Sequence, residues 1–237
     1  MKISLDKIKF FILDALFPKF CLNCKSEGKY LCEDCLSLLD ILENSYCLCE
    51  KPFRLPAAGK CKKCQNKKLN GLYFALYYQN NLVKKIIQRF KYEPFARELS
   101  NDLASLIITH LSLLNKTFDF GDFVLVPIPL YKKKLKWRGY NQAEELAKEL
   151  SKSLKIPLLK DSLDRTKETL PQIELATEAR KNNIKGAFSI KRSELLQKRK
   201  VLLVDDVYTT GATMEECARV LKESGAKEVW GIVVARD

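Results

Sequence analysis

Two adjacent carboxylates, Asp205 and Asp206, follow an apolar run in the stretch VLLVDDVYTTGAT, residues 201–213. The turn after them is rich in hydroxyl groups and consists of Thr209, Thr210, Gly211, Ala212 and Thr213. A turn that leads into a helix offers backbone N–H groups and positive potential to a phosphate, and threonine hydroxyls add donors. Carboxylates beside such a turn accept hydrogen bonds from vicinal hydroxyls like those of ribose. The pattern predicts a site for a ribose 5-phosphate group.

Two other interpretations of this stretch remain open. A strand that ends in Asp-Asp can hold the Mg²⁺ of a nucleotide hydrolase, although the chain has no G-x-x-x-x-G-K-[ST] loop. The threonine turn can also be only the N-cap of the following helix, which we expect to begin near Met214.

Eight of the nine cysteines fall in residues 21–64, where they form close pairs. The pairs are Cys21 with Cys24, Cys32 with Cys35, Cys47 with Cys49, and Cys61 with Cys64. Four thiolates complete the tetrahedral coordination of a Zn²⁺ ion. A segment this short cannot bury an adequate hydrophobic core without a cross-link such as a bound metal. The sequence therefore predicts a zinc-binding segment at 21–68 with one or two structural ions. The tight spacing of Cys47 and Cys49 leaves the second ion and the ligand pairing open.

Clustered cysteine pairs are typical of metal ligands in a reducing compartment, so we expect a cytoplasmic protein. No secretory signal is expected, because Asp6 and Asp14 interrupt the opening residues and a small-residue cleavage site is missing. Residues 1–20 place apolar side chains at helical spacing, which predicts an amphipathic helix docked on the body of the protein. Flanking lysines leave peripheral contact with the inner face of the membrane as the alternative.

The formal charge is +13, with 42 lysines and arginines against 29 acidic residues. This excess favours anionic partners such as nucleic acid, phosphorylated metabolites or a lipid surface, unless it reflects only a basic composition bias. KLKWRGY and QRFKYEPF place aromatic rings beside cations, and bases of single-stranded DNA stack on such rings. Ordinary half-buried surface is the alternative. The single histidine, His110, lies in an apolar stretch and predicts a structural role, as does Cys217.

From residue 72 onward, apolar runs alternate with helical periodicity. LYFALYY, FVLVPIP and VLLVD predict buried strands, and the helical stretches between them are interrupted near Pro94. Gly225 is expected to end a helix before EVWGIVVA. The alternation predicts a mostly parallel α/β sheet flanked by helices over 72–237. Residues 162–185 are polar with little periodicity and predict a mobile loop.

VLLVDDVYTTGAT resembles the phosphoribosyl-pyrophosphate (PRPP) loop of type I phosphoribosyltransferases. The stretches LFPKFCLNC, VPIPLYKKKLKWRGYNQAEELA and RTKETLPQIELATEARKNNIKGAF extend the resemblance over nearly the whole chain, to the ComF/ComFC competence family. Members of that family join a zinc-finger segment to a phosphoribosyltransferase domain. They are implicated in natural transformation, where they handle incoming single-stranded DNA at the inner face of the cytoplasmic membrane. RGYNQ is far more specific than the PRPP loop.

The resemblance implies roles for individual positions. Asp205 and Asp206 would accept the ribose hydroxyls, the turn at 209–213 would hold the 5-phosphate, and Mg²⁺ would accompany PRPP. Counter-charges to the pyrophosphate would come from Lys133, Lys134 or Arg138. A lid-like loop would carry Arg165, Gln172, Arg180 and Asn183.

Two departures from the relatives' patterns bear on catalysis. Purine-salvage relatives have an acidic general base where this chain has Thr209, which cannot take up a proton at neutral pH. Orotate-type relatives tolerate a non-acidic residue there. The family's usual histidine after the VPIP segment is Tyr131. The function that the resemblance implies is the handling of single-stranded DNA during natural transformation, with PRPP as a ligand and DNA-uptake proteins as partners. The alternatives are an active Mg²⁺-dependent transferase and a ligand-sensing scaffold.

Overall fold

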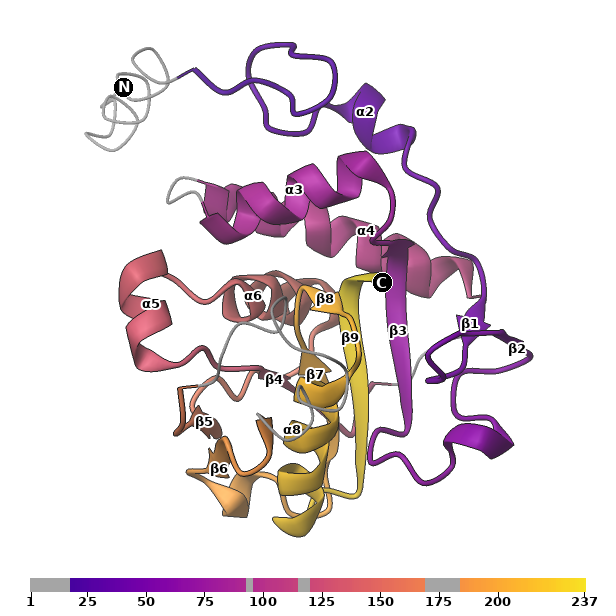
Figure 1. Ribbon diagram of the computed structural model, residues 1–237, viewed down its shortest axis with the longest axis vertical. Helices are drawn as coiled ribbons and strands as arrows, with labels where there is room; N and C mark the ends of the chain where they lie inside the picture. The colour runs from indigo at the N-terminus through magenta and orange to yellow at the C-terminus, as the bar shows by residue number, and fades with distance from the viewer. Residues whose placement is uncertain (1–17, 93–95, 115–119, 169–183) are drawn as a thin grey trace.

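A computed structural model describes residues 18–92, 96–114, 120–168 and 184–237 (Figure 1). Its main sheet is parallel, with the strand order β3–β9–β7–β4, and the short strand β8 also pairs with β9. The bounds are β3 Gly71–Tyr77, β4 Phe123–Pro127, β7 Lys200–Val204, β8 Val207–Tyr208 and β9 Glu228–Arg236. The predicted strands and their parallel arrangement are confirmed.

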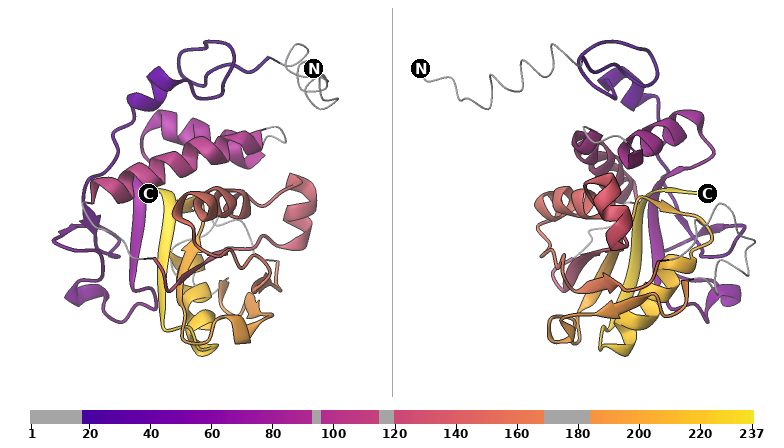
Figure 2. Two further views of the ribbon diagram at one scale, coloured as in Figure 1. Left: turned by 180° about the vertical axis from the view of Figure 1, so that it is seen from behind. Right: turned by 60° about the vertical axis from the view of Figure 1, so that its left-hand side comes forward.

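Both faces of the sheet are buried, because successive strand residues are apolar and point to opposite sides. Leu202 and Val204 of β7 pack into one hydrophobic cluster, whereas Val201 and Leu203 pack into the other. The first cluster includes helices α3 Asn81–Tyr92, α4 Leu99–Leu113 and α6 Gln142–Leu154. The second includes α8 Ala212–Glu223. Figure 2 shows α4 and α6 on one side of the sheet and α8 on the other.

The cysteine-bearing segment packs on the sheet domain at two separate places (Figure 1). Its first part includes α2 Glu33–Ser37, and Leu31 and Leu39 join the cluster formed with α3 and α4. Its second part contains the antiparallel pair β1 Ser45–Tyr46 and β2 Arg54–Leu55, followed by the 3₁₀ turn η1 Lys62–Cys64. The ring of Tyr46 lies 5.5 Å from that of Phe74 on β3.

The remaining elements are η2 Ala96–Glu98, α5 Lys132–Arg138, β5 Leu163–Arg165, β6 Phe188–Ile190 and η4 Ser193–Leu195. The expected loop at 162–185 is wrong at its start, because β5 pairs antiparallel with β6 and buries Leu163. Helix α8 begins at Ala212, two residues before the expected start, because Gly211 takes a positive φ of 78° at its N-cap. Ser224 and Gly225 follow the end of α8, and Gly225 has φ 96°, as expected for a helix terminator. Most of the expected N-terminal helix lies outside the described residues.

Candidate functional site

The acidic pair lies directly after β7, at the carboxyl end of the parallel sheet. The backbone N–H of Asp206 donates a 2.9 Å hydrogen bond to Oδ1 of Asp205. The backbone N–H groups of Val234 and Ala235 on β9 donate to the carbonyl oxygen of Asp206. Neighbouring strands thus fix the backbone of this pair where ligands of parallel α/β sheets bind.

Lys91, near the end of α3, forms an ion pair with Asp206. Its Nζ lies 3.1 Å from Oδ2, and the carboxylate side chain is 5% exposed. Burial and the negative charge of Asp206 raise the pKa of Asp205 to about 7, although Lys91 and Arg165 oppose this shift. One carboxyl group of the pair therefore changes its protonation near neutral pH.

Two cations expected from the sequence, Lys134 and Arg165, lie close enough to interact electrostatically with this pair. Loss of hydration and the nearby charges of Arg138, Arg165 and Lys91 lower the pKa of Lys134, while Asp206 opposes the shift. Arg165 also interacts electrostatically with Asp205. The structure thus brings cations from α3, α5 and β5 around two carboxylates, an arrangement that can bind an anionic ligand carrying hydroxyl groups.

Lys133, another expected cation on α5, pairs with Glu168 at the surface. Its Nζ lies 3.3 Å from Oε1 of Glu168, and the two side chains are 79% and 58% exposed. An ion pair so exposed contributes little to stability.

Residues 138–141, with the sequence RGYN, connect α5, α6 and α3. Tyr140 is buried and donates its hydroxyl to the carbonyl oxygen of Phe90, the residue before Lys91. Asn141 caps α6 by accepting from the backbone N–H of Ala143, and its amide donates to the carbonyl of Ile128. This network positions Lys91 beside the acidic pair, which gives the motif a physical role.

The loop between the acidic pair and α8 depends on glycine. Gly211 adopts φ 78°, and a Cβ there would lie 2.1 Å from the hydroxyl oxygen of Tyr208. Thr210 Oγ1 accepts a 3.4 Å hydrogen bond from the backbone N–H of Ala212. Thr209 is exposed, and Thr213 is half-buried in the first turn of α8. The hydroxyl groups and the helix N-terminus therefore occur together, as the sequence predicts.

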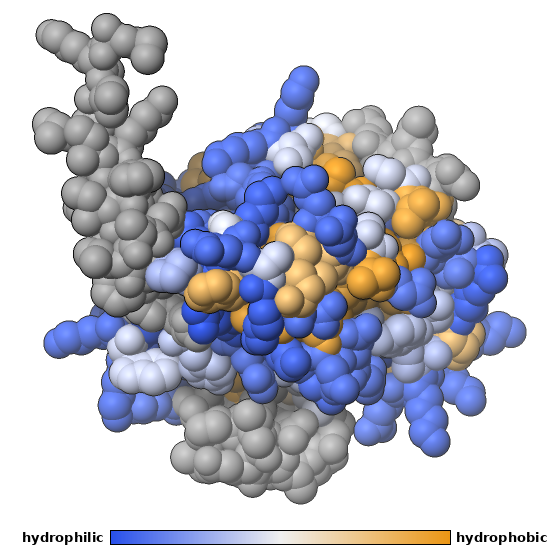
Figure 3. Space-filling view, turned by 90° about the horizontal axis from the view of Figure 1, so that it is seen from above, coloured by the Kyte–Doolittle hydropathy of each residue, from blue (hydrophilic) through white to orange (hydrophobic). Residues whose placement is uncertain are grey.

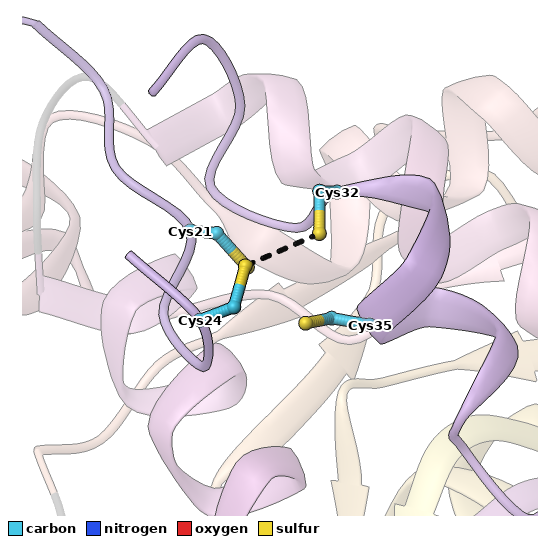
Figure 4. Close-up of side chains that lie close together, drawn as sticks. All are labelled: Cys21, Cys24, Cys32 and Cys35. Atoms are coloured by element: carbon cyan, nitrogen blue, oxygen red, sulfur yellow. Dashed lines mark hydrogen bonds between the residues drawn. The ribbon is translucent and has the colours of Figure 1, made fainter. Parts of the chain in front are cut away.

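The first cysteine cluster brings together the sulfur atoms of Cys21, Cys24, Cys32 and Cys35 within 4.8 Å of one another. Figure 4 shows the four side chains converging, with Cys24 and Cys32 sulfurs 3.5 Å apart. Sulfurs around a tetrahedral Zn²⁺ are about 3.8 Å apart, given a Zn–S distance of about 2.3 Å. Backbone hydrogen bonds from Cys32, Asn23 and Cys24 outweigh burial and lower the pKa of Cys21 to about 6. The group can hold a metal ion.

The second cluster brings together Cys47, Cys49 and Cys61 within the same 4.8 Å limit. Cys64 adjoins them, since its sulfur lies 3.5 Å from that of Cys61. The cysteines of both clusters are free thiols, which is the state that metal binding requires. The first two pairs thus lie in one cluster and the last two in the other, a grouping that the sequence left open.

The second cluster is joined to the loop after the acidic pair. Arg236, 1% exposed at the end of β9, donates to the carbonyl oxygens of Cys47 and Cys49. Its guanidinium lies 5.2 Å from the ring centroid of Tyr208. Lys67 Nζ donates to the carbonyl of Leu48 at 2.6 Å and to the Tyr208 hydroxyl at 3.3 Å. The second cysteine cluster and the segment after the acidic pair thus share a support.

Three residues of the expected lid-like loop, Arg180, Gln172 and Asn183, lie outside the described residues.

His110 and Cys217 have surroundings that fit structural roles. His110 is buried, with Nδ1 2.5 Å from the carbonyl oxygen of Leu42, and Cys217 is fully buried.

Sequence reasoning missed Lys91 and Arg236 as site-supporting residues. The aromatic and basic composition of QRFKYEPF was the available signal for Lys91, whereas nothing in the sequence around Arg236 indicated its contacts.

Comparison with known proteins identifies the class. The family model described as a phosphoribosyl transferase domain matches residues 135–237, which contain the acidic pair and its loop. The chain is 32% identical over 230 residues to Competence protein F of Haemophilus influenzae, covering 87% of this chain and 97% of that one. It is 30% identical over 204 residues to Competence protein ComFC of Bacillus subtilis, covering 82% and 79% respectively. The chain belongs to the ComF/ComFC family of competence proteins.

A third relative matches a shorter region. DNA utilization protein YhgH of Escherichia coli is 38% identical over 109 residues, which are 45% of this chain and 47% of that protein. Within the described part of the chain, no helix combines the length and the apolar character needed to cross a membrane.

Proposed function

We propose that this protein handles single-stranded DNA during natural transformation and binds PRPP or a related ribose phosphate at the acidic pair. The relatives are named for competence and DNA utilization, which supports the first part. The observation that supports the second part is the placement of Lys91, Lys134 and Arg165 around Asp205 and Asp206, with the ion pair of Lys91 and Asp206 at 3.1 Å.

In the proposed complex, the acidic pair accepts hydrogen bonds from the ribose hydroxyls, and the turn at 209–213 binds the 5-phosphate. The cations on α5 and β5 neutralise the pyrophosphate, which Mg²⁺ accompanies. DNA lies on the nearby aromatic surface, where Tyr92 and Trp137 are 53% and 71% exposed. We also propose Zn²⁺ as the metal of both cysteine clusters, with a structural role, and DNA-uptake proteins as partners at the inner face of the cytoplasmic membrane.

An active Mg²⁺-dependent phosphoribosyltransferase is the second candidate. The raised pKa of Asp205, about 7, favours it, because a carboxyl group that titrates near neutral pH can accept a proton from an acceptor substrate. Thr209 at the usual position of the general base argues against purine-salvage chemistry.

The test of the proposed function is to titrate one preparation separately with Mg²⁺-PRPP, by calorimetry, and with a fluorescent oligothymidylate, by anisotropy. We expect both to bind. Release of pyrophosphate only when a nucleobase is added would favour the transferase. Failure of both titrations would refute the proposal.

A further inference from the structure

A basic groove of about 360 Å³ separates the first cysteine segment from α3. Its lining residues are Leu22, Lys25, Lys85, Gln88, Arg89 and Tyr92. Three of the six are cations, and no carboxylate occurs among these described lining residues. A hollow lined in this way attracts an anionic ligand.

The cations of the groove are held on ordered backbone. Lys25 lies in the turn between Cys21 and Cys32, and its backbone N–H donates to the carbonyl oxygen of Cys21 at 3.1 Å. Opposite it, Lys85 is exposed on α3. The guanidinium of Arg89 lies 4.9 Å from the ring centroid of Tyr30. Tyr30 lies between Cys24 and Cys32, so this contact joins the first cysteine segment to α3.

Tyr92 connects the groove to an exposed aromatic pair. Its ring lies 6.0 Å from that of Trp137 in an edge-on arrangement, and the guanidinium of Arg138 lies 5.2 Å from the Tyr92 centroid. Lys91, the next residue in the chain, pairs with Asp206. A single turn of α3 thus links the groove, the aromatic pair and the acidic pair. Figure 3 shows the upper face of the molecule covered mostly by hydrophilic residues, with a hydrophobic area at its centre.

We propose that this groove binds the phosphate backbone of single-stranded DNA whose bases stack on Tyr92 and Trp137. This inference rests on the proposed function and assigns a binding site to the DNA. Alternating cations and exposed rings are the features by which proteins bind single strands without sequence preference. The strand passes beside the acidic pair without entering it, since carboxylates repel phosphodiesters and DNA has no vicinal ribose hydroxyls. DNA and PRPP therefore bind at the same time.

The test compares two variants that lose the same charge. Lys25→Gln with Lys85→Gln alters the groove, whereas Lys62→Gln with Lys63→Gln removes two exposed cations from the second cysteine segment. Oligothymidylate affinity is measured by anisotropy over a range of salt concentrations, and PRPP affinity by calorimetry on the same samples. We expect the groove variant to flatten the log–log salt slope by about 1.4, at about 0.7 per phosphate contact. The matched variant should keep nearly the full slope, and both should bind PRPP and metal like the wild type.

An unchanged slope in the groove variant would overturn the proposal, as would an equal loss in the matched variant, which would place the DNA elsewhere. Competition between PRPP and the oligonucleotide for the wild-type protein would overturn simultaneous binding. Failure of the proposed function and failure of the groove give different results. Wild-type protein that binds neither ligand refutes the proposed function and the groove together, whereas wild-type protein that binds both while the groove variant retains its slope refutes only the groove.

Discussion

Arg236 Nη1 donates a 2.6 Å hydrogen bond to the carbonyl oxygen of Cys47, which connects the last residue of β9 to the second cysteine cluster. The same guanidinium lies over the ring of Tyr208, the last residue of β8, which precedes the loop into α8. One buried side chain therefore supports both the cluster and the loop. Stability of the cluster and order of the loop should depend on each other.

Arg236→Gln is expected to lower the free energy of unfolding and to speed metal release from the second cluster. Each lost hydrogen bond from a charged donor should cost about 1.5–3 kcal/mol. Urea unfolding and release of metal to a colorimetric chelator measure the two effects. Lys152→Gln is the control, because its side chain is 69% exposed in its ion pair with Glu149 and surface ion pairs contribute about 1 kcal/mol or less. Identical release from the wild type and Arg236→Gln would contradict the proposed support.

Metal analysis should find close to two equivalents of zinc for each chain. Cys32→Ser and Cys61→Ser should each reduce this content by about one equivalent and destabilise the segment that carries the cluster, because metal binding and local folding are coupled. Cys217→Ala is the control, since this ninth cysteine is a buried residue of α8 and lies outside both clusters. Metal-free protein with unchanged circular dichroism and thermal stability would rule out a structural ion.

PRPP affinity should rise with pH through the neutral range. Burial and Asp206 raise the pKa of Asp205 to about 7, and only the ionised carboxylate can accept hydrogen bonds from both ribose hydroxyl groups. Calorimetry between about pH 6 and 8 should show this rise in the wild type and a flatter profile in Asp205→Asn. Superimposable profiles would show that Asp205 is not the titrating group.

The Asp205 carboxyl should affect the stability of the fold with the opposite pH dependence: its contribution falls as pH rises. Its folded pKa lies above the ordinary value of 3.8, so the folded protein retains a proton that the unfolded chain releases. The contribution of Asp205 to stability is therefore present at low pH and is lost as pH rises through about 7.

Trp137→Ala should weaken oligothymidylate binding by about 1–3 kcal/mol without changing the salt slope, because stacking involves no phosphate contact. Leu135→Ala is the control on the same helix, where the leucine is 41% exposed. Anisotropy titrations of the three proteins test this expectation. Equal affinities would mean that the ring is ordinary surface.

The features that the sequence predicts best are those carried by local patterns. The apolar runs of β3, β4 and β7 and the cysteine pairs each depend on residues a few positions apart, so spacing alone identifies them. The cations on α5 were expected from the resemblance; in the structure Lys134 interacts electrostatically with Asp206, and their role in binding stays a prediction.

The missed features depend on contacts between distant parts of the chain. Tyr140 holds the end of α3 and so places Lys91 beside Asp206. Neither Tyr140 nor Asp206 can be inferred from the residues around Lys91. Likewise, the polar residues of β5 showed no period, yet pairing with β6 makes them a strand. Tertiary pairing overrides local preference in such short segments.

The most direct test of the ribose-phosphate site is a calorimetric titration of Mg²⁺-PRPP into Asp205→Asn with Asp206→Asn, beside the wild type. The substitutions preserve side-chain shape, and metal content and thermal unfolding check that the fold persists. We predict that the wild type binds and that the double variant binds at least about 30-fold more weakly, since each lost hydrogen bond should cost about 1 kcal/mol or more. A double variant that titrates like the wild type would contradict the central claim.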